Sequence, residues 1–205
     1  MFGRCARVAR GKGPSQAKLE PNLITCRLKP FPGADADAGA VAGASVDLTR
    51  AGARLELRYR LEGDMGRLRL PAPATAIGRA DGLWRATCFE AFVRRADGRD
   101  YLEFNLSPSG QWAAYRFDDY RDGMADLDMP APAIGCEGGQ DRVALEAVLD
   151  LPAAWADAPL DVALCAVIED AAGALAYWAL THPVETPDFH HPGGFALHLP
   201  ASESS

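Results

Sequence analysis

The sequence predicts an all-β fold, a single two-layer β-sandwich of about nine or ten antiparallel strands. Fifteen prolines and twenty glycines are spread along the 205 residues, and short runs typical of β-strands lie between them. Stretches of ten or more residues with helical periodicity are hard to find. With 48% apolar residues, the chain is long enough for one substantial core, so we expect one domain.

Basic residues gather at the N-terminus. Residues 1–30 hold seven lysines or arginines and a single acid, Glu20, and they lack the continuous apolar core of a secretory signal. We expect a disordered basic tail over residues 1–27, with an Arg-rich targeting segment or an over-extended start as alternatives. The sandwich domain then covers residues 28–200, and residues 201–205 form a flexible C-terminus.

The rest of the chain is acidic, with 14 basic and 27 acidic side chains and a balance of −13. Such a body repels a phosphate backbone, which argues against nucleic-acid binding. No apolar run approaches the roughly 20 residues of a membrane span. The five cysteines are odd in number and form no C-x-x-C pair, so a reduced, cytoplasmic compartment fits best.

The first part of the domain predicts one clear strand. Residues 33–45 are rich in Gly, Ala and Asp, and they predict a loop or a loose edge strand. Residues 54–61, RLELRYRL, alternate apolar and charged side chains, as a half-buried strand does. Residues 67–71 continue this alternation, and residues 72–82 predict a loop.

Three strands then follow as a meander. Residues 84–95, 101–107 and 111–117 have strand patterns. Asp97-Gly98 predicts a two-residue turn between the first two strands, and residues 108–110 predict a three-residue turn with Gly110 in a left-handed conformation. The turns therefore set the register of all three strands.

This register sorts the side chains onto two faces, because side chains alternate along a strand and cross-strand partners share a face. One face collects Glu90, Phe92, Arg94, Tyr101, Glu103, Asn105, Tyr115 and Phe117. The other face collects Phe89, Ala91, Val93, Leu102, Phe104, Leu106, Trp112 and Ala114. A slip by one residue would put Glu103 into the core in place of Phe104, so the register is strongly specified.

The remaining sequence predicts a long polar connection over residues 118–141, one helical turn within residues 151–159, and four strands. These strands are residues 142–151, 161–169, 174–182 and 195–200. The second of them is apolar on both faces, which indicates a central position in its sheet.

The polar face of the meander has three interpretations. It is a solvent-exposed surface whose Phe92 and Phe117 are covered by a loop or by the tail. Alternatively, it is a concave site that combines stacking rings with rigid hydrogen-bonding groups, as a small polyhydroxylated ligand requires. Thirdly, Glu90 and Glu103 serve as the acid and base of a glycoside hydrolase, whose carboxyl groups lie about 5 to 9 Å apart. No nucleophile or lid pattern accompanies the third interpretation.

The loop THPVETPDFHHPGGF holds His182, Asp188, His190 and His191. These residue types bind zinc or iron when they converge. Adjacent histidines point in opposite directions in an extended segment, however, and the prolines keep this loop extended. The loop residues are therefore structural, in contact with a ligand, or bound to a metal.

The segments DGLWRATCFEAFVRRADGRDYLEFNLSPSGQWAAY and YWALTHPVETPDFHHPGGFALHL resemble the DOMON-like superfamily, which includes family 9 carbohydrate-binding modules. The likeness covers roughly residues 28–200 and implies a sandwich of the jelly-roll kind with a binding role. In those modules a Trp just before a strand reading x-V-E-[IV]-F forms one wall of a sugar clamp, and Trp84 before TCFEAF resembles it. The second wall is an aromatic residue shortly before the last strand. In this chain Asp188, Phe189 and His190 stand there, and no Trp does.

The same superfamily contains haem-binding domains that resemble b-type cytochromes, with Met and His or a similar pair on the iron. His182 with Met65 or Met124 would be the candidates, but nothing in the spacing singles them out. A haem pocket also needs an apolar slot, which a face with two glutamates does not supply. We therefore expect no metal and no cofactor, with haem as an alternative.

Our leading hypothesis is a non-catalytic module that binds a small carbohydrate or a similar polar molecule. The expected ligand-binding residues are Trp84, Glu90, Glu103, Asn105, Tyr115, His182, Asp188 and His190. The Trp and Tyr would stack on a ring, the two acids and the amide would bind hydroxyls, and the loop residues would close the site. The alternatives are a haem or metal redox domain, a glycoside hydrolase using Glu90 and Glu103, and an interaction protein whose aromatic face pairs with another subunit.

Overall fold

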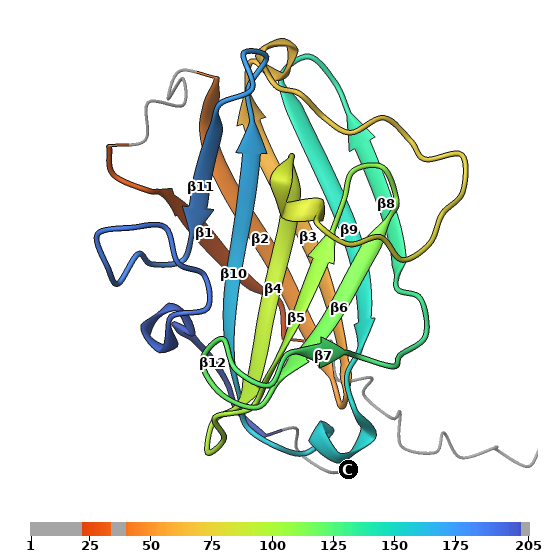
Figure 1. The fold of residues 1–205 in the computed structure, drawn as a ribbon, viewed down its shortest axis with the longest axis vertical. Helices are drawn as coiled ribbons and strands as arrows, with labels where there is room; N and C mark the ends of the chain where they lie inside the picture. Colours follow the sequence, from red (N-terminus) through yellow and green to blue (C-terminus); the bar gives the residue numbers. More distant parts are fainter. Residues whose placement is uncertain (1–21, 34–39, 202–205) are drawn as a thin grey trace, which may run out of the picture.

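The computed structural model describes residues 22–33 and 40–201 (Figure 1). The strands in these ranges are β1 (Ile24–Pro30), β2 (Val41–Ala51), β3 (Arg54–Gly63), β4 (Cys88–Arg95), β5 (Tyr101–Leu106), β6 (Trp112–Phe117), β7 (Ala125–Asp126), β8 (Ala133–Gly138), β9 (Arg142–Asp150), β10 (Leu160–Glu169), β11 (Leu175–Ala179) and β12 (Leu197–Leu199). The helices in these ranges are short 3-10 turns, η1 (Met65–Arg67), η2 (Leu83–Arg85), η3 (Ala153–Trp155) and η4 (Pro192–Gly194). None of these helices has the length and apolar character needed to cross a membrane.

The strands form two antiparallel layers, one behind the other in Figure 1. One layer has the order β1-β2-β3-β9-β8, and the other has the order β7-β6-β5-β4-β10-β11, with β12 pairing the start of β10 on the side opposite β4. The end of β1 also pairs with β11, at Lys29 with Ala179 and Pro30 with Trp178, so the layers join into one curled sheet. The all-β, two-layer sandwich is confirmed, while the jelly-roll connectivity stays a prediction.

The core lies between the two layers. In β3 the side chains of Leu55, Leu57, Tyr59 and Leu61 are buried and alternate with charged residues, as the sequence predicted. The Tyr59 ring packs against the Phe89 ring with centroids 5.1 Å apart. The Tyr59 hydroxyl also donates a hydrogen bond of 2.7 Å to the backbone oxygen of Glu90, which ties β3 to β4 across the core.

The register of the meander is confirmed. Glu90 pairs with Asn105 between β4 and β5, and Glu103 pairs with Tyr115 between β5 and β6. Gly110 has a φ of +85°, which is the left-handed conformation that the turn requires. The prediction that residues 161–169 form a central strand is also confirmed, because β10 has neighbours on both sides.

Two boundaries near the N-terminus were wrong. Strand β1 begins at Ile24, inside the segment assigned to a tail over residues 1–27, because Leu28 is buried and the strand pairs with β2. The expected tail over residues 1–21 lies outside the described residues, as do residues 202–205. Residues 41–45 are the start of the inner strand β2 rather than a loose edge, since β1 and β3 flank them.

Two further elements differ from the sequence prediction. The polar connection over residues 118–141 contains the short β7 and the edge strand β8, so the described residues hold twelve strands rather than nine or ten. Strand β8 is mostly exposed, and its sequence AIGCEG has no alternation of apolar and polar residues. Residues 67–71 alternate but form no strand, because Leu68 makes only an isolated bridge to Asp170.

Phe104→Ala should lower the free energy of unfolding by about 3 to 5 kcal/mol, the usual cost of removing a buried aromatic ring. Phe104 is fully enclosed between the layers. Urea denaturation followed by fluorescence measures the change, and Leu23→Ala at an exposed position should change stability by less than about 0.5 kcal/mol. Equal effects of the two substitutions would contradict this packing.

Candidate functional site

The outer face of the meander is divided into a covered part and an open part. Phe92, Tyr101 and Phe117 belong to a second cluster of buried residues, against which Phe189 and Phe195 of the His-containing loop pack. The His190 ring meets the Phe92 and Phe117 rings edge-on, with centroids 5.0 and 5.1 Å apart. The loop therefore covers these rings, as one of the three interpretations of this face expected.

Beside the covered rings a cavity of about 520 Å³ opens between the meander, the end of β10, β11 and the loops. Its lining residues are Trp84, Arg85, Glu90, Glu103, Tyr115, Phe117, Arg121, Met124, Val167, Leu175, Tyr177, Pro187, Phe189 and His190. Aromatic walls around a few buried polar groups are typical of small-molecule sites. This part of the face is therefore concave, and ligand binding there stays a prediction.

Five of the eight expected site residues line this cavity, namely Trp84, Glu90, Glu103, Tyr115 and His190. Asn105 is buried behind it, and its side-chain amide donates a 2.6 Å hydrogen bond to Glu103 Oε1. The structure does not bring His182 to the cavity. Its Nε2 lies 2.9 Å from the backbone oxygen of Lys29, and its ring meets Phe31.

Glu90 is the most unusual residue of the site. It is 3% exposed, and its Oε1 has no hydrogen-bond partner within residues 22–33 and 40–201. Burial, with the neighbouring Glu103 as a second cause, raises the pKa of Glu90 well above its ordinary value. A buried carboxyl group of this kind in a cavity is a candidate for direct contact with a ligand.

Glu103 is also buried, with 6% of its surface exposed. Burial raises the pKa of Glu103, although the hydrogen bond from Asn105 and the charge of Arg121 act in the opposite direction. Its Oε2 lies 3.7 Å from His190 Nε2. Burial favours the neutral form of each partner, so this contact is not a strong ion pair.

His190 is held by a hydrogen bond from its backbone N–H to Asp188 of the same loop and by a hydrogen bond with Tyr101 of β5. Its Nδ1 lies 2.8 Å from the Tyr101 hydroxyl, which also accepts a hydrogen bond from the backbone N–H of Arg121. Burial lowers the pKa of His190 to about 4, with the charge of Arg121 as a second cause, and burial raises the pKa of Tyr101 to about 12. The tyrosine hydroxyl is therefore hydrogen-bonded to a neutral imidazole, whose Nε2 faces Glu103.

Asp188 joins the two loops that cover the face. It accepts hydrogen bonds from the Tyr120 hydroxyl at 2.5 Å and the Arg121 guanidinium at 2.8 Å. Burial alone would raise the pKa of Asp188, but these two hydrogen bonds outweigh it and lower the pKa. Arg121 has a φ of +53°, which is uncommon for a residue with a side chain and costs of order 1 kcal/mol. Asp188 thus holds the cover in place and does not line the cavity.

The aromatic side of the cavity is built by Trp84 and Tyr115. Trp84 is 38% exposed, and its ring meets the Tyr115 ring edge-on at 6.3 Å. The Tyr115 hydroxyl donates a 2.6 Å hydrogen bond to Asp81, and the Arg79 guanidinium lies 5.0 Å from the ring centroid. Tyr115 is therefore fixed, while the neighbouring Trp84 offers free aromatic surface.

Several lining residues were not predicted from the sequence. Arg121 and Met124 come from the segment that was assigned to a polar connection, and Tyr177 and Phe189 meet edge-on with centroids 6.1 Å apart. The alternation along β11 puts Tyr177 on one face of the strand, but it does not determine whether that face borders the cavity. No local sequence signal indicates that the turn at Arg121 returns to the meander.

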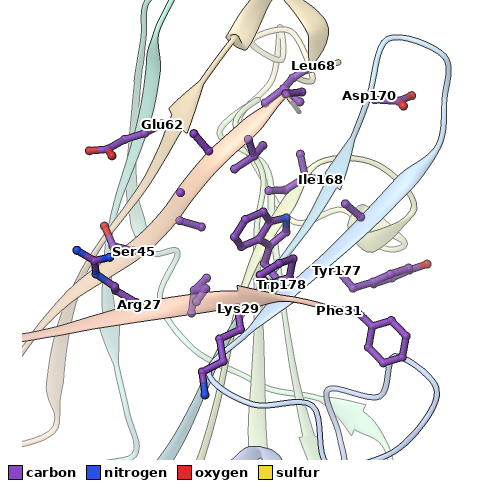
Figure 2. Close-up of a pocket in the computed structure, with 18 of the residues that line it drawn as sticks. Arg27, Lys29, Phe31, Ser45, Glu62, Leu68, Ile168, Asp170, Tyr177 and Trp178 are labelled. Carbon is purple, nitrogen blue, oxygen red and sulfur yellow. The ribbon is translucent and has the colours of Figure 1, made fainter. Parts of the chain in front are cut away.

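A larger cavity of about 940 Å³ lies between β1 and β2 on one side and β10 and β11 on the other (Figure 2). Leu28 and Trp178 in its wall belong to the main core, and Arg27 and Lys29 extend from β1 (Figure 2). None of the buried polar residues in the described ranges lines it. Because its wall adjoins residues 34–39, which are outside those ranges, the smaller cavity is the better-defined site.

The described ranges contain no group of three or more His, Cys, Asp or Glu that could hold a metal ion. The haem candidates are also separated, since Met124 lines the cavity while His182 does not, and Met65 is in the main core. Within the same ranges Cys26, Cys88, Cys136 and Cys165 are free thiols.

No protein-family model matches the chain, and no curated protein matches it in sequence. A crystal structure of a Bacteroides uniformis protein, named a "putative carbohydrate-binding protein", shares the fold with a TM-score of 0.60. The alignment covers 84% of each chain at 14% sequence identity. At this identity the likeness shows a common β-sandwich fold, and the relation to the DOMON-like superfamily remains a resemblance.

His190 should titrate near pH 4. Its pKa is lower in the folded protein than the ordinary value of about 6.5, so as the pH falls through this window the unfolded chain takes up a proton first and stability is lost. His190→Gln should remove that loss, which is at most about 3 kcal/mol between pH 6.5 and 4. NMR of the imidazole resonances, assigned by their absence in the variant, measures the pKa, and a midpoint near 6.5 would contradict the buried position.

Proposed function

We propose that this chain is a non-catalytic binding module for a small carbohydrate or a similar polar molecule, held in the cavity beside the meander. The observation that carries the proposal is the buried, unpartnered carboxyl oxygen of Glu90 in a cavity lined by aromatic rings. A buried polar group without a partner costs free energy, and a ligand that supplies hydrogen bonds compensates for this cost.

The lining supports distinct roles for its residues. The exposed ring of Trp84 offers stacking area for a sugar ring, and Tyr115 forms a second aromatic edge. Glu90 and Glu103 provide oxygens for hydroxyl groups, while Asn105 orients Glu103 through its 2.6 Å hydrogen bond. His190 packs over the covered rings, and its Nε2 faces Glu103. We assign His182 no part in binding, because it lies outside the cavity.

The fold of the Bacteroides uniformis protein agrees with a carbohydrate ligand, although a shared fold does not specify a ligand. Binding through rings and carboxyl groups requires no metal or cofactor, and we propose none. We further propose a cytoplasmic location, which the free buried thiols of Cys88 and Cys165 favour because a reducing compartment keeps them unpaired.

A glycoside hydrolase is the second candidate. Glu90 and Glu103 are diagonal neighbours on β4 and β5, and burial raises the pKa of both carboxyl groups. Glycosidases place one protonated and one ionised carboxyl group on the two sides of the scissile bond. In this cavity both acids lie on the same sheet face rather than on two sides of a ligand, and this arrangement favours binding over catalysis.

Trp84→Ala should weaken sugar binding about five- to thirtyfold, because loss of a stacking ring costs about 1 to 2 kcal/mol. Titration calorimetry against a panel of mono- and disaccharides, including amino sugars, measures the affinity. Ile77→Ala removes an exposed apolar side chain outside the cavity and should leave binding unchanged. No heat from any sugar up to about 10 mM, or equal affinity of Trp84→Ala and the parent protein, would refute the proposal.

If the chain is instead a hydrolase, either Glu90→Gln or Glu103→Gln should reduce the turnover of a chromogenic glycoside by at least about 100-fold, because each acid would have a separate role. Release of nitrophenol from a panel of nitrophenyl glycosides measures the rate. We expect no turnover by the parent protein. Turnover that both substitutions abolish would replace the binding module with an enzyme.

A further inference from the structure

The two carboxyl groups of the cavity floor have unused acceptor oxygens. Glu90 Oε1 has no hydrogen-bond partner in the described part of the chain. Glu103 Oε1 accepts the amide of Asn105, but its Oε2 is 3.7 Å from His190 Nε2, which is beyond hydrogen-bond distance. Each of these two oxygens can therefore accept a further N–H or O–H donor.

Two arginines close to the cavity make their hydrogen bonds with other groups than these acids. The Arg121 guanidinium donates to Asp188 at 2.8 Å, and the Arg79 guanidinium donates to Asp126 at 2.6 Å and to the backbone oxygen of Ala114. His190, with a pKa lowered to about 4 mainly by burial, is neutral at physiological pH. In residues 22–33 and 40–201 no arginine forms an ion pair with Glu90 or Glu103, although the charge of Arg121 lowers the pKa of Glu103 and Arg85 lines the same cavity.

The walls suit a positively charged ligand. The rings of Trp84, Tyr115, Phe117, Tyr177 and Phe189 line the cavity, and the face of an aromatic ring attracts a cation through its quadrupole. A chain with a formal net charge of −7 also favours the approach of a cation over that of an anion.

We infer that the cavity selects ligands that carry a protonated amine, such as an amino sugar or an amino polyol. The ammonium N–H groups donate to Glu90 Oε1 and Glu103 Oε2, and the rings surround the charge. This inference rests on the proposed function, because it names the group that the same cavity recognises. A neutral hydroxyl supplies the hydrogen bonds but not the charge, so the amine is the better partner.

Binding is linked to a proton. Burial and Glu103 together favour the protonated form of Glu90 in the empty cavity. The other titratable groups around it are Cys88, Cys165 and Tyr59, whose pKa values burial raises, so they stay neutral. An incoming ammonium ion favours the carboxylate, and the carboxyl proton leaves to solvent, which keeps the charge balanced. Affinity therefore increases with pH while the amine remains protonated.

The test is calorimetry with matched probes at pH 6. Glucosamine should bind at least about tenfold more tightly than glucose or N-acetylglucosamine, because only the first carries a charged amine. Cyclohexylamine and cyclohexanol repeat the comparison without a sugar ring. Glu90→Gln should abolish the preference for the amines. Glu146→Gln, at an exposed site where the side chain pairs with Arg58, should retain it.

The same titration in two buffers of different ionisation enthalpy measures proton release on binding, which should be detectable for the amines and should disappear in Glu90→Gln. Circular dichroism confirms that the variant is folded, and Glu103→Gln replaces it if it is not. Equal binding of glucose and glucosamine overturns the inference while the proposed function stands. Glu90-dependent binding of cyclohexylamine without any sugar binding supports the inference and overturns the carbohydrate assignment. Failure of both amines to bind overturns the inference.

Discussion

The register of β4, β5 and β6 is the constraint on which the other features depend. Because side chains alternate, the pairing that buries Phe104 between the layers also directs Glu103 and Asn105 to the outer face. Tyr59 reinforces this arrangement from the opposite layer through its hydrogen bond to the backbone of Glu90. A shift by one residue would exchange the two faces, so the packing of the core and the position of the site are determined by the same contacts.

The cover over the outer face follows from that register. A sheet face that carries Phe92, Tyr101 and Phe117 has too much apolar surface to remain open to water, and the His-containing loop buries it. The loop is held by hydrogen bonds to Asp188 from the turn after β6, and by contacts of His190 with the rings beneath it. The cavity lies beside the part of the face that the loop covers. The acids Glu90 and Glu103 of the sheet and aromatic rings of the sheet and the loop therefore line it together.

Much of this arrangement was accessible from the sequence because it is local. Two short turns fixed the meander, and the alternation along it placed Glu90, Glu103 and Tyr115 on one face. The remainder depends on long-range contacts that leave no local signal. Strand β8 is an exposed edge without alternation, and the positions of Arg121 and Tyr177 depend on how a turn and a neighbouring strand pack. His182 was misplaced for the same reason, since composition alone does not separate two histidines of one loop.

The proposed function also gives the buried acids an explanation that folding does not give. A glutamate whose pKa is higher in the folded protein lowers stability at pH values above its unfolded pKa of about 4.3, because the unfolded chain ionises freely there. Buried positions of the main core are occupied by Leu, Val and Phe. An apolar residue at position 90 would therefore stabilise the fold more than a buried glutamate does. A ligand that pairs with Glu90 binds only the folded state and thereby returns the free energy that its burial costs. Under the proposed function, the protein gives up stability at Glu90 and ligand binding recovers it, as is common at functional sites.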